Sequence, residues 1–176
     1  MRIISDAYQH LGAKLLAEIL DNQQRPVFSW ADLWYEQTDF PEVAEEIYYP
    51  AVFFDFAADT ISSIGQLEQD VTLNIDIYVV METLADTAIN SPERPDGLHY
   101  LELCACVHEI LQGYEHHSCG NLNRVGFARY SARTNVIVYR LTYASSVVDT
   151  SATELRRATK PAPPNAFTQA PKRFDI

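Results

Sequence analysis

The sequence predicts an α+β fold, with one mainly antiparallel or mixed β-sheet of about five strands and two helices packed on one face of it. Two segments have the three- and four-residue apolar spacing of helices, and others alternate apolar and polar residues as strands do. The strands follow one another in blocks, in the order α-β-β-β-α-β-β, instead of alternating with helices. We expect residues 1–151 to form a single domain and residues 152–176 to form an extended C-terminal tail.

The first element is a helix, predicted from Ser5 to about Asp21. Its apolar residues recur at spacings of three and four, which places them on one stripe of a helix: Ala7, Leu11, Leu15, Leu16, Ile19 and Leu20. Ser5 and Asp6 are typical of an N-cap region, because their side chains accept hydrogen bonds from the free N–H groups of a first turn. The helix is therefore expected to begin at these two residues.

Three strands are predicted after this helix. Residues 27–36 are rich in aromatic side chains, and residues 51–56 form a run, opened by a proline, that is apolar on both faces. Between them, residues 38–49 are acidic and contain a proline, which indicates a connecting loop. The clearest signal is residues 71–79, where every odd position is aliphatic and most even positions are polar. One face of this third strand should lie on the core and the other should face water or a partner.

A long polar connection, residues 82–97, follows the third strand. It contains two prolines and an Asp-Gly pair, and it is longer than the ~4–6 residues of a typical loop. Long loops of this kind are commonly used for contacts. Glu93 and Arg94, within this connection, are therefore candidate interface residues.

The second helix is predicted from about Asp96 to Gln112. Its apolar residues cover most of its circumference, which indicates burial across a sheet face: Leu98, Leu101, Leu103, Cys104, Ala105, Val107, Ile110 and Leu111. Residues 122–133 and 135–148 are then predicted to form a β-hairpin that turns at Thr134-Asn135. The second strand of this hairpin places aliphatic and aromatic residues on one face.

The net charge is unevenly distributed along the chain. The 176 residues include 24 acidic and 13 basic side chains, a net charge of −11. Residues 152–176 hold five basic and two acidic side chains, a balance of +3 that leaves −14 for the rest. Residues 1–151 are so acidic that they should repel the phosphate backbone of a nucleic acid. We therefore expect no sequence-specific nucleic-acid binding, and DNA would at most pass through an acidic channel. In the tail, Arg156, Arg157 and Lys160 are candidates for contact with an acidic partner surface.

One cluster of residue types could ligate a metal ion. Cys104 and His108 lie one turn apart on the second predicted helix, and Cys119 or His116 could complete a tetrahedral site. However, cysteines within an apolar helix behave as small hydrophobes, and no C-x-x-C pair is present. The chain also lacks a G-x-S-x-G elbow, a phosphate-binding glycine loop and an H-E-x-x-H pair. We therefore predict no metal site, no cofactor and no enzymatic activity, and thiols that belong to the core.

Aromatic residues gather in the first third of the chain. Trp30, Trp34, Tyr48 and Tyr49 combine a large apolar area with a polar group, which suits both a core and an interface. Asp76 lies in the middle of the clearest strand, on its polar face. We take these five residues as candidates for an interface, and the core remains the alternative for the aromatic ones.

The sequence resembles the tail terminator (tail completion) proteins of long-tailed bacteriophages and prophages over residues 3–150. The resemblance rests first on the order of the elements, which ends with one long helix and a final hairpin. It rests also on two strands. One strand opens with Tyr49-Pro50-Ala51-Val52-Phe53-Phe54, and in the other the polar pair Gln69-Asp70 leads into Val71-Thr72-Leu73-Asn74-Ile75-Asp76-Ile77-Tyr78-Val79. The resemblance implies a non-enzymatic subunit of a ring, usually a hexamer, that caps the tail tube and ends its polymerisation. Its partners would be copies of itself, the tail tube protein and the head-tail connector proteins.

The resemblance also implies a location in the virion tail, after synthesis in the cytoplasm of a bacterial host. No stretch approaches the ~20 consecutive apolar residues of a membrane span, and the first residues lack the apolar core of a signal peptide, so we expect no membrane partner. Three alternatives stay open. One is another head-tail joining or minor tail protein of the same particle. The second is a small metal-dependent or hydrolytic enzyme built on the cysteine and histidine cluster or on pairs of acidic residues, and the third is a binding module for a host protein.

Overall fold

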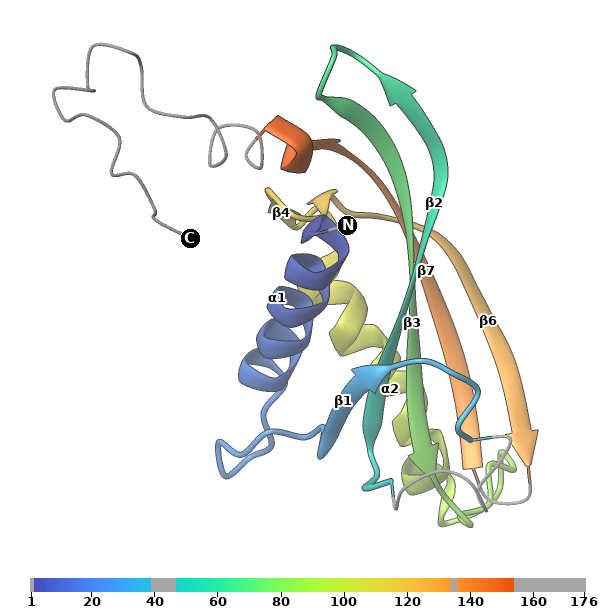
Figure 1. The fold of residues 1–176 in the computed structure, drawn as a ribbon. Helices are drawn as coiled ribbons and strands as arrows, with labels where there is room; N and C mark the ends of the chain where they lie inside the picture. Colours follow the sequence, from blue (N-terminus) through green and yellow to red (C-terminus); the bar gives the residue numbers. More distant parts are fainter. Residues whose placement is uncertain (1, 39–46, 134–135, 154–176) are drawn as a thin grey trace, which may run out of the picture.

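A computed structural model describes residues 2–38, 47–133 and 136–153 of the chain. Both helices lie on the same face of a five-stranded sheet (Figure 1). The elements are α1 (Arg2–Glu18), β1 (Trp30–Leu33), β2 (Ala51–Ser63), β3 (Gln69–Glu82), α2 (Arg94–Leu111), β4 (Glu115–His116), β5 (Gly120–Asn121), β6 (Asn123–Arg133) and β7 (Val136–Asp149). The predicted α+β class and the predicted order of the helices and sheet strands are confirmed.

The sheet has β3 at its centre. Its strand order is β1-β2-β3-β7-β6, and β4 and β5 form a separate two-stranded sheet. β1 pairs with β2 in parallel, whereas the other three pairings are antiparallel, so the sheet is mixed. β3 pairs with β7 from Gln69 to Glu82, and with β2 from Gln69 to Val80. The predicted β6–β7 hairpin is confirmed, and its turn residues, 134–135, lie outside the described residues.

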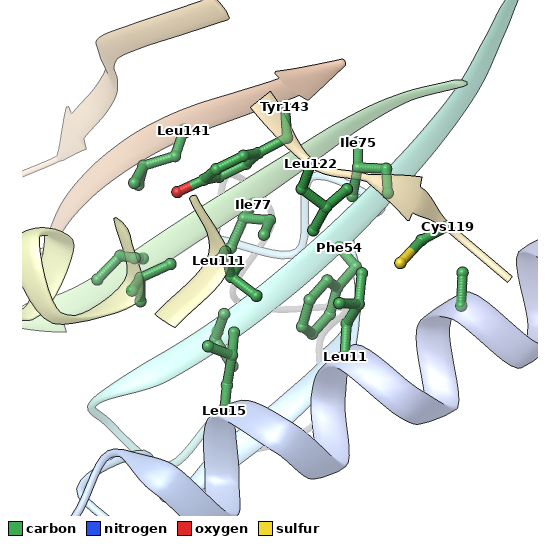
Figure 2. Packing of buried hydrophobic residues seen from close by; sticks show 14 of the residues in the cluster. Leu11, Leu15, Phe54, Ile75, Ile77, Leu111, Cys119, Leu122, Leu141 and Tyr143 are labelled. Carbon is green, nitrogen blue, oxygen red and sulfur yellow. The ribbon is translucent and has the colours of Figure 1, made fainter. Parts of the chain in front are cut away.

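The main core lies between the two helices and the sheet (Figure 2). The odd positions of β3 are buried, as their alternation predicts: Val71, Leu73, Ile75, Ile77 and Val79. The helices bury Ile3, Ala7, Leu11 and Leu15 from α1, and Leu103, Val107 and Leu111 from α2. Each large side chain buried in this way contributes roughly 1.5–3 kcal/mol. Burial on this one face therefore holds both helices to the same side of the sheet.

The first helix begins earlier than the sequence predicts. α1 starts at Arg2, so Ser5 and Asp6 lie inside the helix and the N-cap prediction is wrong. The reason is that Ile3 is buried four residues before Ala7, which extends the apolar stripe by one turn. At the other end, the helix stops at Glu18, and the carboxylate of Asp21 then accepts hydrogen bonds from the backbone N–H groups of a following turn.

The extents of several other elements differ from the prediction. β2 continues to Ser63 instead of ending at Phe56, because its pairing with β3 does not require apolar side chains. β1 is shorter than the predicted strand 27–36, since it pairs only with the first four residues of β2. In α2, Leu101 and Ala105 are exposed, so burial is confined to one face of this helix.

Some predictions fall outside the described residues, and one element was missed. Residues 39–46, most of the predicted acidic loop, and residues 154–176, nearly all of the predicted tail, are not among them. The β4–β5 sheet was not predicted, because strands of two residues leave no periodic signal. It matters to the packing, since Cys119 and Leu122, beside it, are fully buried in the main core.

Ile75→Ala is expected to lower the free energy of unfolding by about 2–5 kcal/mol, because Ile75 is fully buried under the helices and leaves a cavity when it is truncated. Ile64→Ala is the matched control, since Ile64 is exposed in the β2–β3 turn, and it should change the free energy of unfolding by less than about 0.5 kcal/mol. Urea unfolding followed by circular dichroism measures both. Equal effects of the two substitutions would contradict the assignment of the core.

Candidate interaction surfaces

The helix-free face of the sheet carries an aromatic cluster at one end. The chain leaves β1 and crosses this face, so that Trp34 stacks on Tyr78 of β3, with ring centroids 4.2 Å apart (Figure 1). Trp34 also makes edge contacts with Phe53 of β2 and Tyr130 of β6, at 5.8 and 5.4 Å. Phe53 and Tyr78 are buried there, in a second and smaller core. Through these ring contacts, Trp34 packs the end of β1 against β2, β3 and β6.

A buried glutamine fixes the segment that follows β1. The side-chain amide of Gln37 donates a hydrogen bond to the carbonyl of Leu33 (2.9 Å), and its oxygen accepts one from the N–H of Tyr35 (2.8 Å). Because both of these backbone groups are satisfied internally, the turn keeps Trp34 against the sheet while Tyr35 points into solvent. Tyr35 is therefore a large aromatic residue on the surface.

The other aromatic candidates lie at the margin of this second core. Trp30 and Tyr49 are partly buried against it, and burial, followed by the nearby Glu82 carboxylate, raises the pKa of Tyr49. Tyr48 is more exposed and lies tilted against Trp30, with ring centroids 6.0 Å apart. Of the four predicted aromatic residues, Tyr48 is therefore the most available to a partner. An interface role for any of them remains a prediction.

Beyond the aromatic cluster, the helix-free face is polar and acidic. Thr142 Oγ1 donates a hydrogen bond to Asp76 Oδ1 at 2.5 Å, and Arg140 Nη1 lies 3.6 Å from Asp76 Oδ2. Asp55 of β2 is directly opposite Asp76 in the register. Two carboxylates in such a pair repel each other, and the single guanidinium offsets this in part. Asp70 adds a third carboxylate farther along β3, where it accepts a hydrogen bond from Ser146.

The connection between β3 and α2 exposes two large apolar side chains. Leu84 is 86% exposed and Ile89 is 78% exposed. Arg94 holds the backbone of this loop by donating a hydrogen bond from Nη1 to the carbonyl of Ile89 (2.7 Å), and Glu93 Oε2 accepts one from the N–H of Asp86 (3.5 Å). The two predicted contact residues thus help to shape the loop. Leu84 and Ile89, which precede them in the loop, are the more conspicuous surface feature. Their signal in the sequence was an isolated Leu and an isolated Ile within a polar stretch.

Two strands, β2 and β6, have a free edge within the described residues. β1 covers only the first four residues of β2, which leaves Asp55 to Ser63 without a strand partner on that side. On its outer side, β6 pairs with no strand of the part of the chain that the structure describes. In Figure 1 the free part of β2 belongs to the β2–β3 hairpin that extends past the helices. Unpaired backbone N–H and C=O groups along such edges can bind another strand.

The candidate metal ligands named from the sequence, Cys104, His108, His116 and Cys119, are not assembled into a site. Cys104 and Cys119 are buried, and burial raises the pKa of their thiols to about 12 and about 11, which keeps them protonated. His108 lies 3.4 Å from the hydroxyl of Tyr143 and His116 stacks on another histidine. In the part of the chain that the structure describes, no three His, Cys, Asp or Glu side chains are arranged to hold a metal ion.

Three histidines instead stack between α1 and the β4–β5 sheet. The rings of His10 and His116 are nearly parallel with centroids 3.6 Å apart, and the ring of His117 lies 4.0 Å from that of His116. His10 Nε2 is also 2.5 Å from the hydroxyl of Tyr114. Burial, and then the charge that His10 and His117 carry when protonated, lower the pKa of His116, while the Asp6 carboxylate opposes the shift. The stack is therefore most stable when His116 is neutral.

Comparison with known proteins gives no family for this chain. No protein-family model matches it, and no curated protein matches it significantly in sequence. Within residues 2–38, 47–133 and 136–153, no helix is both long and apolar enough to cross a lipid bilayer. The tail candidates Arg156, Arg157 and Lys160 lie outside the described residues. The surfaces described above are therefore the basis for any functional proposal.

The histidine stack predicts a pH dependence of stability. Because the pKa of His116 in the folded protein is below about 6.5, its value in the unfolded chain, the unfolded state binds more protons as the pH falls through this interval. The contribution of neutral His116 to the free energy of unfolding is therefore complete above about pH 6.5, and it is lost as the pH falls toward the lowered pKa of the folded state. His116→Gln should flatten the fall of the midpoint of thermal unfolding between pH 7 and pH 5. A midpoint that falls as steeply in His116→Gln as in the wild type would refute the role of the stack.

Proposed function

We propose that this protein is a structural subunit of a tailed phage or prophage particle, which assembles as a ring, caps the tail tube and presents its other surface to the head. One observation carries the proposal: a single sheet has both helices on one face, an acidic helix-free region on the other, and a free edge on each side. The resemblance of the sequence to tail terminators supplies the biological setting. A ring of six copies is the expected assembly.

A closed ring needs two different surfaces on each subunit that fit one another. The two free edges meet this requirement, because they lie on opposite sides of the same sheet. In the proposed ring, the helices lie on the outside and the helix-free face lines the lumen. There, the carboxylates Asp55, Asp70 and Asp76 would repel phosphate groups, so that DNA passes without being captured.

The purified full chain is expected to form closed rings whose mass is an integer multiple of 20.0 kDa. Light scattering behind size exclusion over a range of concentrations measures the mass, and negative-stain electron microscopy shows whether the particles are closed. Added to polymerising tube protein of the same particle, the chain should bind tube ends and limit tube length. A concentration-independent monomer that leaves tube length unchanged would refute the proposal. Rings that ignore the tube would point to another position in the neck of the particle.

The exposed apolar loop predicts which end of the subunit meets its axial partner. Leu84→Ser with Ile89→Ser should leave the ring mass and thermal stability unchanged, because both side chains are almost fully exposed, and should weaken binding to tube ends. Ile64→Ser is the matched control at the opposite end of β3, about 45 Å away along its 14 residues. Tube-length assays with the two variants decide between the ends. Loss of capping in Ile64→Ser alone would assign the contact to the β2–β3 turn.

A further inference from the structure

The two free edges of the sheet carry opposite charge. The unpaired part of β2 contains Asp55 and Asp59 and no basic residue, whereas β6 contains arginines, of which Arg124 and Arg129 are exposed, and no acidic residue. Two β2 edges therefore repel each other, as do two β6 edges, and only the unlike pair attracts. This pattern selects a head-to-tail contact between copies and disfavours symmetric dimers.

The strand directions also suit this pairing. Three antiparallel pairings separate β2 from β6, namely β2/β3, β3/β7 and β7/β6, so β2 and β6 run in opposite directions. When a copy of the sheet is repeated by rotation about an axis along the strands, its β6 arrives antiparallel to the β2 of the first copy. We propose, on the basis of the ring proposed above, that β2 of one subunit pairs with β6 of the next, which makes one continuous sheet around the ring.

A specific register follows from the exposed apolar residues. Ile61 is 52% exposed and Phe127 is 47% exposed, and both belong to the helix side of the sheet, since they pair with the buried Val71 and Leu141. An antiparallel register that sets Ile61 beside Phe127 also sets residue 59 opposite residue 129. The attraction between Asp59 and Arg129 and the burial of the two apolar side chains thus favour the same alignment.

The bulges define how long this ladder can be. The register of β2 shifts between Ala58 and Thr60, and that of β6 shifts between Arg124 and Gly126 and again between Arg129 and Ser131. In the register given above, residues 126–128 fall opposite residues 60–62, and Arg129 falls opposite Asp59, the bulged residue at which the regular ladder ends. Bulges limit how far an edge can pair, so the contact is short, and the charges rather than length provide its specificity.

Charge reversal tests the pairing directly in the full chain. Asp55→Lys with Asp59→Lys gives two basic edges, and Arg124→Glu with Arg129→Glu gives two acidic edges. Each variant alone should associate at least about tenfold more weakly than the wild type, while circular dichroism shows it folded. An equimolar mixture of the two variants, and a chain carrying all four reversals, should regain association, because unlike edges then meet again. Light scattering at low and high salt measures the mass, and so the degree of association, of each variant and of the mixture.

Cysteine crosslinking tests the register. Ile61→Cys with Phe127→Cys in one chain should form disulfide-linked ladders under mild oxidation, whereas each single substitution should not. The two positions cannot bridge within a chain, because three strand spacings, about 14 Å, separate them. Disulfide-linked dimers of the Ile61→Cys single variant would overturn the head-to-tail contact in favour of a symmetric one.

The outcomes separate this inference from the proposed function. Rings that form equally well with one pair of charges reversed would overturn the β2–β6 contact and leave the ring proposal standing. A chain that stays monomeric at every concentration and with tube protein would overturn both. Association that is lost in each double variant and regained in their mixture supports the contact, since no interface elsewhere on the subunit accounts for that rescue.

Discussion

Burial of one face of β3 is the constraint on which the rest of the structure depends. This strand is paired on both sides, and five of its alternate residues lie under the helices. A shift of register by one residue would move this apolar set to the other face, so the alternation fixes the register of β2 and β7 as well. Because α1 and α2 both pack on this face, no helix among the described residues covers the opposite face.

The helix-free face has an aromatic region and a polar, acidic region. At the end where β1 joins the sheet, Trp34 crosses over Tyr78 and Phe53 and closes a second core. Toward the β2–β3 turn, the face is made of small polar side chains and carboxylates, with Arg140 beside Asp76. The first region contributes to the stability of the protein, whereas the second is open to solvent. The boundary between the two regions is set by the segment after β1, because this segment covers only the end of the sheet at which β1 pairs with β2.

The sequence predicts best those features that depend on local periodicity. The alternation in residues 71–79 gives the central strand, and the spacing of Leu11 and Leu15 gives the first helix and its buried face. The length of β2 and the burial of Trp34 depend on pairing partners far along the chain, so local patterns do not contain them. Of the candidate site, the sequence identified the aromatic residues and the loop. The free edges could not be predicted, because an edge is defined by which strand is absent beside it.

Free strand edges are hazardous to a protein that must remain soluble before it assembles, since any other strand can add to them. Charged residues and bulges reduce this hazard, and β2 and β6 have both. If the two edges had the same charge, however, the protection would also prevent ordered assembly. Placing aspartates on one edge and arginines on the other keeps like edges apart and still allows unlike edges to pair. In the proposed ring, the charges that protect each edge from aggregation would also select its neighbour, because the backbone groups that every strand shares cannot distinguish one edge from another.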